Sequence, residues 1–91
     1  MLTIYSKKVC PFCVNAKNFL TAKGIEFDVV DIEENEDARE FIKSQGHRTV
    51  PQIYHNGKLF VEGGFQGLSR LTKEDIERKI NANNDLSLGT L

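Results

Sequence analysis

Apolar and polar residues alternate over Leu2–Tyr5, as in a short strand, and then take up helical spacing. Pro11 suits the first turn of a helix, because that turn has no backbone hydrogen bond to lose. Gly24 suits the position just after a helix, where the chain often needs a positive φ. We therefore predict a strand and then a helix that ends at about Lys23. The apolar positions that give this helical spacing are Val14, Ala16, Phe19, Leu20 and Ala22.

A second strand and a second helix follow. The run from Ile25 to Ile32 is rich in apolar and β-branched residues and predicts a strand. Asn35 or Glu34 is expected to open the next helix, and Gly46 to end it. The apolar face of this helix is predicted to contain Ala38, Phe41 and Ile42.

A hairpin comes next along the chain. Val50–Tyr54 predicts one strand, with a proline at its start, and Lys58–Val61 predicts its partner. Between them, Asn56-Gly57 strongly indicates a type I′ turn, in which both residues have positive φ. His55 borders this turn, and we expect it to be exposed.

The remaining pattern is helical. Gly63-Gly64 breaks the strand, and Phe65–Leu71 can form a helical turn. Thr72 and Asp75 have the spacing of a capping box at the start of a final helix. The apolar residues of that helix are Ile76 and Ile80.

The predicted order of elements, β-α-β-α-β-β-α, defines the fold class. A strand–helix–strand opening favours a parallel pair, whereas the hairpin is antiparallel. We therefore predict an α/β fold, a four-stranded mixed sheet flanked by helices. With 91 residues the chain has room for one domain, expected over residues 1–82. Residues 83–91 are expected to form a polar C-terminal tail that is frayed or lightly docked.

Composition is that of a globular protein, with 40% hydrophobic and 27% charged residues. A net charge of −1 gives no indication of nucleic-acid binding, and no apolar run approaches the length of a membrane helix. No signal peptide is evident after Met1. We expect a cytoplasmic monomer that binds neither nucleic acid nor membranes. In a reducing compartment, a cysteine pair is more often catalytic or metal-binding than structural.

The only two cysteines, Cys10 and Cys13, form the sequence Cys-Pro-Phe-Cys between the first strand and the first helix. Cys10 falls at or near the helix N-cap, where free backbone N–H groups and the positive helix end favour a thiolate. Lys7 and Lys8 add positive charge nearby. Cys10 is therefore the candidate nucleophile. Cys13, one helical turn later, is suited to attack a mixed disulfide on Cys10 and release the reduced partner.

Three other roles are open to this cysteine pair. A zinc half-site needs two more ligands, but the chain has no further cysteine, and His47 and His55 do not form a closely spaced pair. Two buried, inert cysteines fit poorly with the lysines and the proline of an exposed turn. A permanent structural disulfide would close a loop too small to add much stability. The residues favour a redox pair and predict no metal site.

Pro51 lies at the start of the third strand, where its missing N–H is tolerated. Most X–Pro bonds in folded proteins are trans, so a trans proline at a sheet edge is one interpretation. With a cis bond instead, the backbone of Val50 would be free to pair with an extended substrate. Gly63-Gly64 is either a simple turn or a place where the backbone approaches a ligand closely.

As a set, these residues resemble the glutaredoxin family. The resemblance extends over residues 2–82 and rests on Lys8–Cys13, Arg48–Ile53, Asn56–Lys58 and Gly63–Phe65. It implies a thioredoxin-like fold, a cis Pro51, and glutathione-dependent reduction of protein disulfides and glutathione mixed disulfides. Glutathione would then be the cosubstrate, with no tightly bound cofactor. The implied partners are disulfide-containing proteins, with ribonucleotide reductase as one possibility.

The resemblance also implies a role for each matching residue. Cys10 matches the nucleophile and Cys13 the resolving thiol. Lys8 and Arg48 match residues that contact the glycine carboxylate of glutathione, and the backbone of Val50 matches the partner of its cysteinyl part. The implied glutathione contacts are Lys8, Phe12, Arg48, Thr49, Val50, Pro51, Gly64, Phe65 and Gln66.

Two features depart from the family pattern. Gln66 and Gly67 stand where an acidic pair is usual, so the carboxylate expected to meet the glutathione ammonium is missing. The stretch from Thr49 to Gly64 is also about two residues longer than is common. Phe65 is similar to the equivalent residue of glutaredoxin-like donors to ribonucleotide reductase, which often draw electrons from thioredoxin reductase. That role is the main alternative. An iron–sulfur cluster held between two subunits by their nucleophilic cysteines and two glutathiones is a less favoured one.

Overall fold

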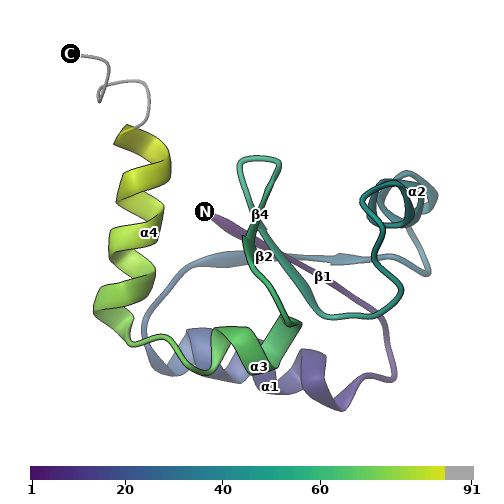
Figure 1. Cartoon of the computed structure of the whole chain (residues 1–91). Coiled ribbons are helices and arrows are strands. Elements are labelled where there is room, and N and C mark those ends of the chain that lie inside the picture. Colours follow the sequence, from purple (N-terminus) through teal and green to yellow (C-terminus); the bar gives the residue numbers. More distant parts are fainter. Residues whose placement is uncertain (86–91) are drawn as a thin grey trace.

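The computed structural model describes residues 1–85, and the order of elements along them matches the predicted one (Figure 1). One short helix is added before the last. The elements are β1 (Leu2–Ser6), α1 (Pro11–Ala22), β2 (Phe27–Asp31), α2 (Glu36–Ser44), β3 (Gln52–His55), β4 (Lys58–Val61), α3 (Gly64–Leu68) and α4 (Lys73–Asp85).

The four strands form one mixed sheet in the order β2-β1-β3-β4. β1 is parallel to β2, with Ile4 opposite Val29, and antiparallel to β3, with Ile4 opposite Ile53. β3 and β4 form the antiparallel hairpin. The predicted α/β fold class, a four-stranded mixed sheet with flanking helices, is confirmed.

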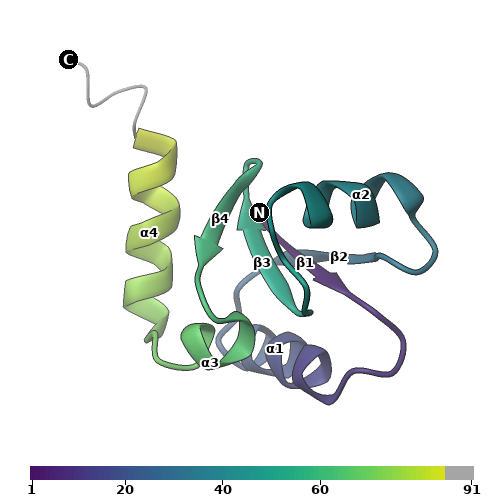
Figure 2. The ribbon, with the colours of Figure 1, turned by 45° about the vertical axis from the view of Figure 1, so that its right-hand side comes forward.

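Helices cover both faces of the sheet. α2 lies on one face, and α1 and α3 lie together on the other (Figure 2). On the α2 face, the ring of Tyr5 packs 5.8 Å from that of Phe41 and 5.5 Å from that of Tyr54, measured between centroids. The main core lies on the other side, and its buried members are Leu2, Ile4, Ala16, Leu20, Ile25, Ile53, Phe60, Leu68 and Ile76.

Gly24 ends α1 as predicted, with a φ of +70°. Its N–H donates to the carbonyl of Thr21, and the N–H of Ile25 donates to that of Leu20, which is the Schellman arrangement. Ile25 is therefore bound to the helix end rather than to the sheet. For that reason β2 is shorter than the predicted strand. Of the apolar residues with helical spacing in α1, Val14 is 47% exposed and lies off the buried stripe formed by Cys13, Ala16 and Leu20.

Gly46, with a φ of +85°, ends α2 in the same way. The N–H of Gly46 donates to the carbonyl of Lys43, and the N–H of His47 donates to that of Ile42. These bonds fix the direction in which the chain leaves α2. The loop that follows leads to Pro51 and passes beside Cys10.

The hairpin turn is the predicted one, because Asn56 and Gly57 both have positive φ, at 53° and 80°. The register shifts between Ile53 and Tyr54, which leaves one extra residue, Phe60, on β4. The expectation that His55 is exposed is wrong. It is 1% exposed, because its position in β3 turns its ring toward that of Phe60.

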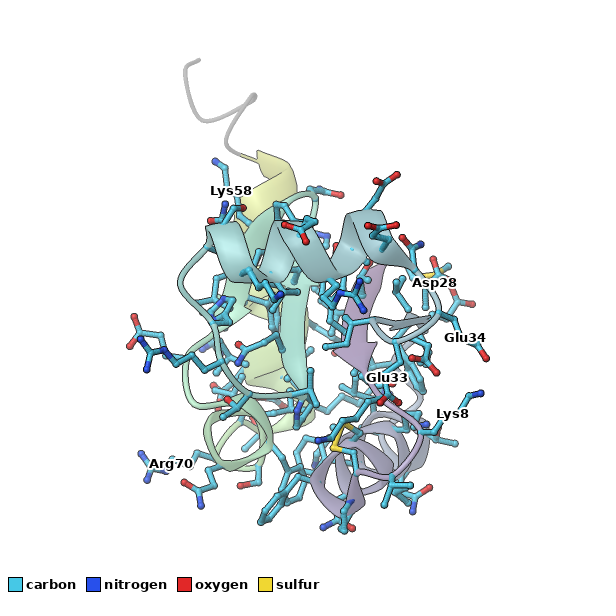
Figure 3. The ribbon with its side chains drawn as sticks, turned by 90° about the vertical axis from the view of Figure 1, so that its right-hand side faces the viewer. Lys8, Asp28, Glu33, Glu34, Lys58 and Arg70 are labelled. Atoms are coloured by element: carbon cyan, nitrogen blue, oxygen red, sulfur yellow. A yellow bond between two sulfur atoms is a disulfide. The ribbon has the colours of Figure 1, made fainter. Side chains whose placement is uncertain are left out.

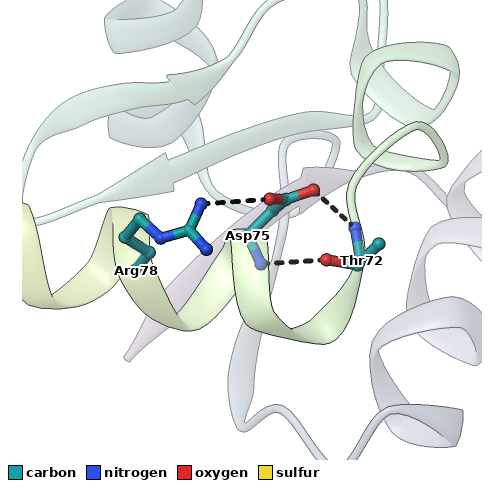
Figure 4. Close-up of polar contacts among 3 residues, drawn as sticks. All are labelled: Thr72, Asp75 and Arg78. Atoms are coloured by element: carbon teal, nitrogen blue, oxygen red, sulfur yellow. Dashed lines mark hydrogen bonds and ion pairs between the residues drawn. The ribbon is translucent and has the colours of Figure 1, made fainter.

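α4 begins with the predicted capping box (Figure 4). The N–H of Asp75 donates to the Thr72 hydroxyl over 3.0 Å, and the N–H of Thr72 donates to the Asp75 carboxylate over 3.1 Å. The helix continues through Asp85, so residues 83–85 of the expected tail are helical. The division at residue 82 stays a prediction, and residues 86–91 lie outside the described part of the chain. No described helix is long and apolar enough to cross a membrane.

Candidate redox site

Cys10 is the N-cap residue of α1, as the sequence predicts. A disulfide joins it to Cys13, with the two Cα atoms 5.2 Å apart, and the pair lies at the start of α1 (Figure 3). The backbone N–H of Cys13 donates to Sγ of Cys10 over 3.1 Å. Cys10 is 7% exposed and Cys13 only 1%. An incoming sulfur therefore reaches Cys10 first.

The charge around the helix start suits an anion at Cys10. The first turn of α1 contains no acidic residue, whereas α2 and α4 each carry two. The positive end of α1 is therefore not neutralised by its own side chains. When the disulfide is reduced, a thiolate at Cys10 gains both this field and the Cys13 N–H. These two effects favour the thiolate form of Cys10 and make it a better leaving group.

The loop before β3 faces the cysteines. The Val50–Pro51 peptide bond is cis, as the resemblance implies. The Val50 carbonyl oxygen lies 3.7 Å from Sγ of Cys10. The side-chain amide of Gln52, which is buried, donates to the Thr49 carbonyl over 2.9 Å and holds this loop. The loop thus presents backbone groups beside the reactive sulfur.

Gly64 supports the cis-proline loop from the other side. It has a φ of +57°, and a Cβ at this position would lie 2.7 Å from the Pro51 carbonyl oxygen. Glycine is required here both by the close approach and by the positive φ. The close approach observed at Gly64 is to the Pro51 carbonyl, and an approach to a ligand stays a prediction.

A groove of about 550 Å³ runs beside the cysteine turn. The ring of Phe12 stacks on that of Phe65 at its side, with centroids 6.5 Å apart. The sequence-predicted residues that line it are Phe12, Thr49, Val50, Pro51, Gly64, Phe65 and Gln66. Gly63, named above as a possible place of close backbone approach, lines it as well. The other lining residues, which were not among the predicted glutathione contacts, are His47, Gln52, Leu59 and Glu62. The bulge in β4 moves the end of that strand, and no local sequence pattern indicates which side chains it turns to the groove.

Lys8, a predicted glutathione contact, does not line this groove. Its Nζ lies 2.9 Å from a carboxylate oxygen of Glu34, and its backbone N–H donates to Glu33 over 3.2 Å (Figure 3). The hydrogen bond that Lys8 donates to Glu34, together with the negative charge of Glu34, raises the pKa of the Lys8 ammonium. Both partners are exposed, so this pair is easily exchanged for another. The acidic loop after β2 thus holds Lys8 in the ligand-free protein.

Arg48, the other predicted carboxylate contact, lines a second pocket of about 340 Å³. This basic pocket adjoins the groove, since both are lined by His47, Thr49 and Val50. Nε2 of His47 lies 2.7 Å from the Tyr54 hydroxyl, and this contact orients the imidazole ring, which lines both the groove and the basic pocket. The cationic residues of the basic pocket are Lys7, Arg39, Lys43 and Arg48.

Within residues 1–85, no three histidine, cysteine or acidic side chains come together as metal ligands. The reactive groups that the structure brings together at the start of α1 are the two sulfurs of Cys10 and Cys13. A disulfide at the start of the first helix, opposite a cis-proline loop, is the redox site of a thioredoxin-like fold.

The chain belongs to the glutaredoxin family. The family model for glutaredoxin matches residues 2–60, which is more than half of the chain. Members of this family are thiol–disulfide oxidoreductases. The cysteine turn, the Thr-Val-Pro loop and the start of the hairpin all fall within the matched residues.

Individual relatives agree with this assignment. Glutaredoxin 3 of Escherichia coli is 46% identical over 52 residues, which are 56% of this chain and 63% of that protein. The chain thus spans less than two thirds of the length of this curated relative. A wheat glutaredoxin structure aligns with a TM-score of 0.70 at 29% identity, over 89% of this chain and 79% of the other. A dithiol glutaredoxin of Trypanosoma brucei brucei aligns with a TM-score of 0.64 at 30% identity, over 89% and 82%.

Proposed function

We propose that this protein is a glutathione-dependent thiol–disulfide oxidoreductase that acts through Cys10 and Cys13. One observation carries the proposal: the more accessible sulfur, Sγ of Cys10, lies at a helix N-cap and 3.7 Å from the Val50 carbonyl, at the edge of a ligand-sized groove. Family membership supports the same chemistry. Proteins that contain disulfides are the proposed partners.

With a glutathione mixed disulfide, the Cys10 thiolate attacks the sulfur of glutathione. A bond forms between Cys10 and glutathione, the original S–S bond breaks, and the partner leaves as a thiolate that takes up a proton. A second glutathione, as its thiolate, then attacks the glutathione sulfur on Cys10. This step releases oxidised glutathione and restores the Cys10 thiolate.

With a protein disulfide, Cys10 first forms a mixed disulfide with the partner. Cys13, one helical turn away and nearly buried, loses its proton and attacks Sγ of Cys10. The partner leaves as a dithiol, and the disulfide between Cys10 and Cys13 forms. Two glutathiones then reduce this disulfide, with oxidised glutathione as the product. The free backbone of Val50 holds the attacked segment in extended form beside the sulfur.

The test compares Cys10→Ser with Cys13→Ser in two assays. We expect Cys10→Ser to lose both activities. Cys13→Ser should still reduce a glutathione mixed disulfide, which needs only Cys10, but fail on a protein disulfide. Persistent activity in Cys10→Ser would exclude the proposed mechanism.

The source of electrons is tested separately. The oxidised protein is offered glutathione alone, or thioredoxin reductase with NADPH, and the return of free thiols is measured. We expect recycling by glutathione. Recycling by the reductase alone would overturn the glutathione assignment and favour the alternative donor role.

A further inference from the structure

We propose that Glu62 binds the α-ammonium group of glutathione and thereby selects this thiol over others. The inference rests on the proposed function, since it concerns how the groove recognises its ligand. Glutathione carries one ammonium group at its γ-glutamyl end and two carboxylates. A groove that selects it needs a negative group for the ammonium and positive groups elsewhere.

The charges beside the cysteine turn are divided in this way. Among the described side chains that line the groove, Glu62 is the only acidic one. The adjoining pocket, which shares Val50 with the groove, is lined by four cationic side chains and no acidic one. A ligand whose sulfur meets Cys10 beside Val50 therefore experiences opposite charges toward its two ends.

The local backbone explains why the negative group comes from residue 62. A Cβ added at Gly67 would collide with the Glu62 carbonyl oxygen and lie 2.9 Å from a methyl group of Val61. The chain after β4 thus passes so close to α3 that no side chain fits at position 67. The neighbouring lining residues are Gly63, Gly64 and Gln66, which carry no charge. Among these neighbouring lining residues, Glu62 is the one that brings a carboxylate to the groove.

The Glu62 side chain is available for this contact. It is exposed, and it takes part in no ion pair within residues 1–85. The Lys8–Glu34 pair shows the opposite case, in which an acidic side chain of the same region is already engaged. A ligand ammonium therefore does not compete with a lysine or arginine of the protein for Glu62.

The experiment measures kcat/KM for two mixed disulfides of one cysteine peptide. One is made with glutathione and the other with glutaryl-cysteinylglycine, which lacks only the ammonium group. Glu62→Gln removes the charge and keeps the shape of the side chain. The matched control is Glu40→Gln. Glu40 is an exposed residue of α2 that lines neither the groove nor the basic pocket.

We expect Glu62→Gln to lose about two- to fivefold in kcat/KM with glutathione, the size of one exposed ion pair, mainly through KM. It should lose nothing with the deamino analogue. The wild-type preference for glutathione should also shrink in high salt, because the pair is screened. Glu40→Gln should behave as wild type with both substrates.

Equal losses with the two substrates, or no loss with either, would overturn the role of Glu62 while leaving the proposed function intact. A wild-type protein that reduces neither mixed disulfide would overturn both. The two failures are thus distinguishable in one set of measurements.

Discussion

The first turns of α1 and α4 have the same cap geometry and opposite chemistry. In α1, the N–H of Cys13 donates to a sulfur, Sγ of Cys10, over 3.1 Å. In α4, the N–H of Asp75 donates to a hydroxyl, that of Thr72, over 3.0 Å. The α4 carboxylate completes a reciprocal pair of hydrogen bonds, whereas α1 has no acid in its first turn.

This difference shows how one structural motif serves stability at one end of the molecule and reactivity at the other. At α4, a carboxylate and a hydroxyl satisfy the free N–H groups and neutralise the positive helix end. At α1 no acidic side chain of the first turn offsets the positive helix end, so its field acts on a thiolate at Cys10. The protein gives up a strong cap at α1, and the field there stabilises the thiolate instead.

The largest effects are expected when the two N-cap residues are substituted separately. Cys10→Ser keeps a side chain that caps well, so under reducing conditions we expect no loss of stability but complete loss of redox activity. Thr72→Ala should lower the free energy of unfolding by about 1 kcal/mol and leave activity unchanged. Urea unfolding and the mixed-disulfide assay measure the two quantities. Thr72→Ser, which keeps the hydroxyl, is the control for α4.

A crossed result would contradict this division of roles. If Thr72→Ala lowered the rate of reduction as well as stability, the α4 cap would be coupled to the redox site. If Cys10→Ser destabilised the reduced protein more than Thr72→Ala does, the sulfur cap would have a structural role.

A smaller effect is expected from adding to α1 the acid that the other helices carry. Val14 is 47% exposed at the end of the first turn. Val14→Glu should stabilise the helix but reduce the thiolate fraction at Cys10. We expect alkylation of Cys10 by iodoacetamide near pH 7 to slow about two- to fivefold, the size of one charge–dipole interaction. Val14→Gln is the neutral control, and an equal slowing in it would show that charge is not the cause.

The starts of α1 and α4 are both predictable from local sequence. The N-cap cysteine, the Thr72–Asp75 capping box and the glycines that end α1 and α2 are all signals within one or two helical turns. The predicted element order holds for the same reason. Local patterns determine where a helix starts and stops, and both caps are local patterns.

Features that depend on distant contacts were not predictable in this way. The residues alone left the Val50–Pro51 bond open, because no short sequence pattern separates a cis from a trans proline at the start of a strand. The burial of His55 depends on how β3 pairs with β4, which brings its ring to that of Phe60. The position of Glu62 in the groove depends on the bulge at Phe60 and on the close approach of Gly67. A glutamate before two glycines otherwise indicates only an exposed turn.

The smallest effect is the pH dependence of the α4 cap. The hydrogen bond from the Thr72 N–H lowers the pKa of the Asp75 carboxyl below its ordinary value of 3.8. A carboxyl with a lower pKa in the folded state stabilises the protein above its unfolded pKa. This stabilisation is lost as the pH falls through the folded value. Arg78, 3.3 Å from the same carboxylate, adds little because both groups are exposed.

Asp75→Asn tests this linkage through urea unfolding at several pH values. At neutral pH the variant should be slightly less stable than wild type. The two curves should converge as the pH falls below about 3.8, because protonation then removes the same interaction from the wild type. Glu77→Gln, on the same helix but outside the capping box, should show no such convergence. A difference between Asp75→Asn and wild type that stayed constant down to the lowest pH would mean that packing, and not the ionised cap, carries the effect. The α4 cap would then differ from the α1 cap only in the Thr72 hydroxyl, which replaces the sulfur of Cys10.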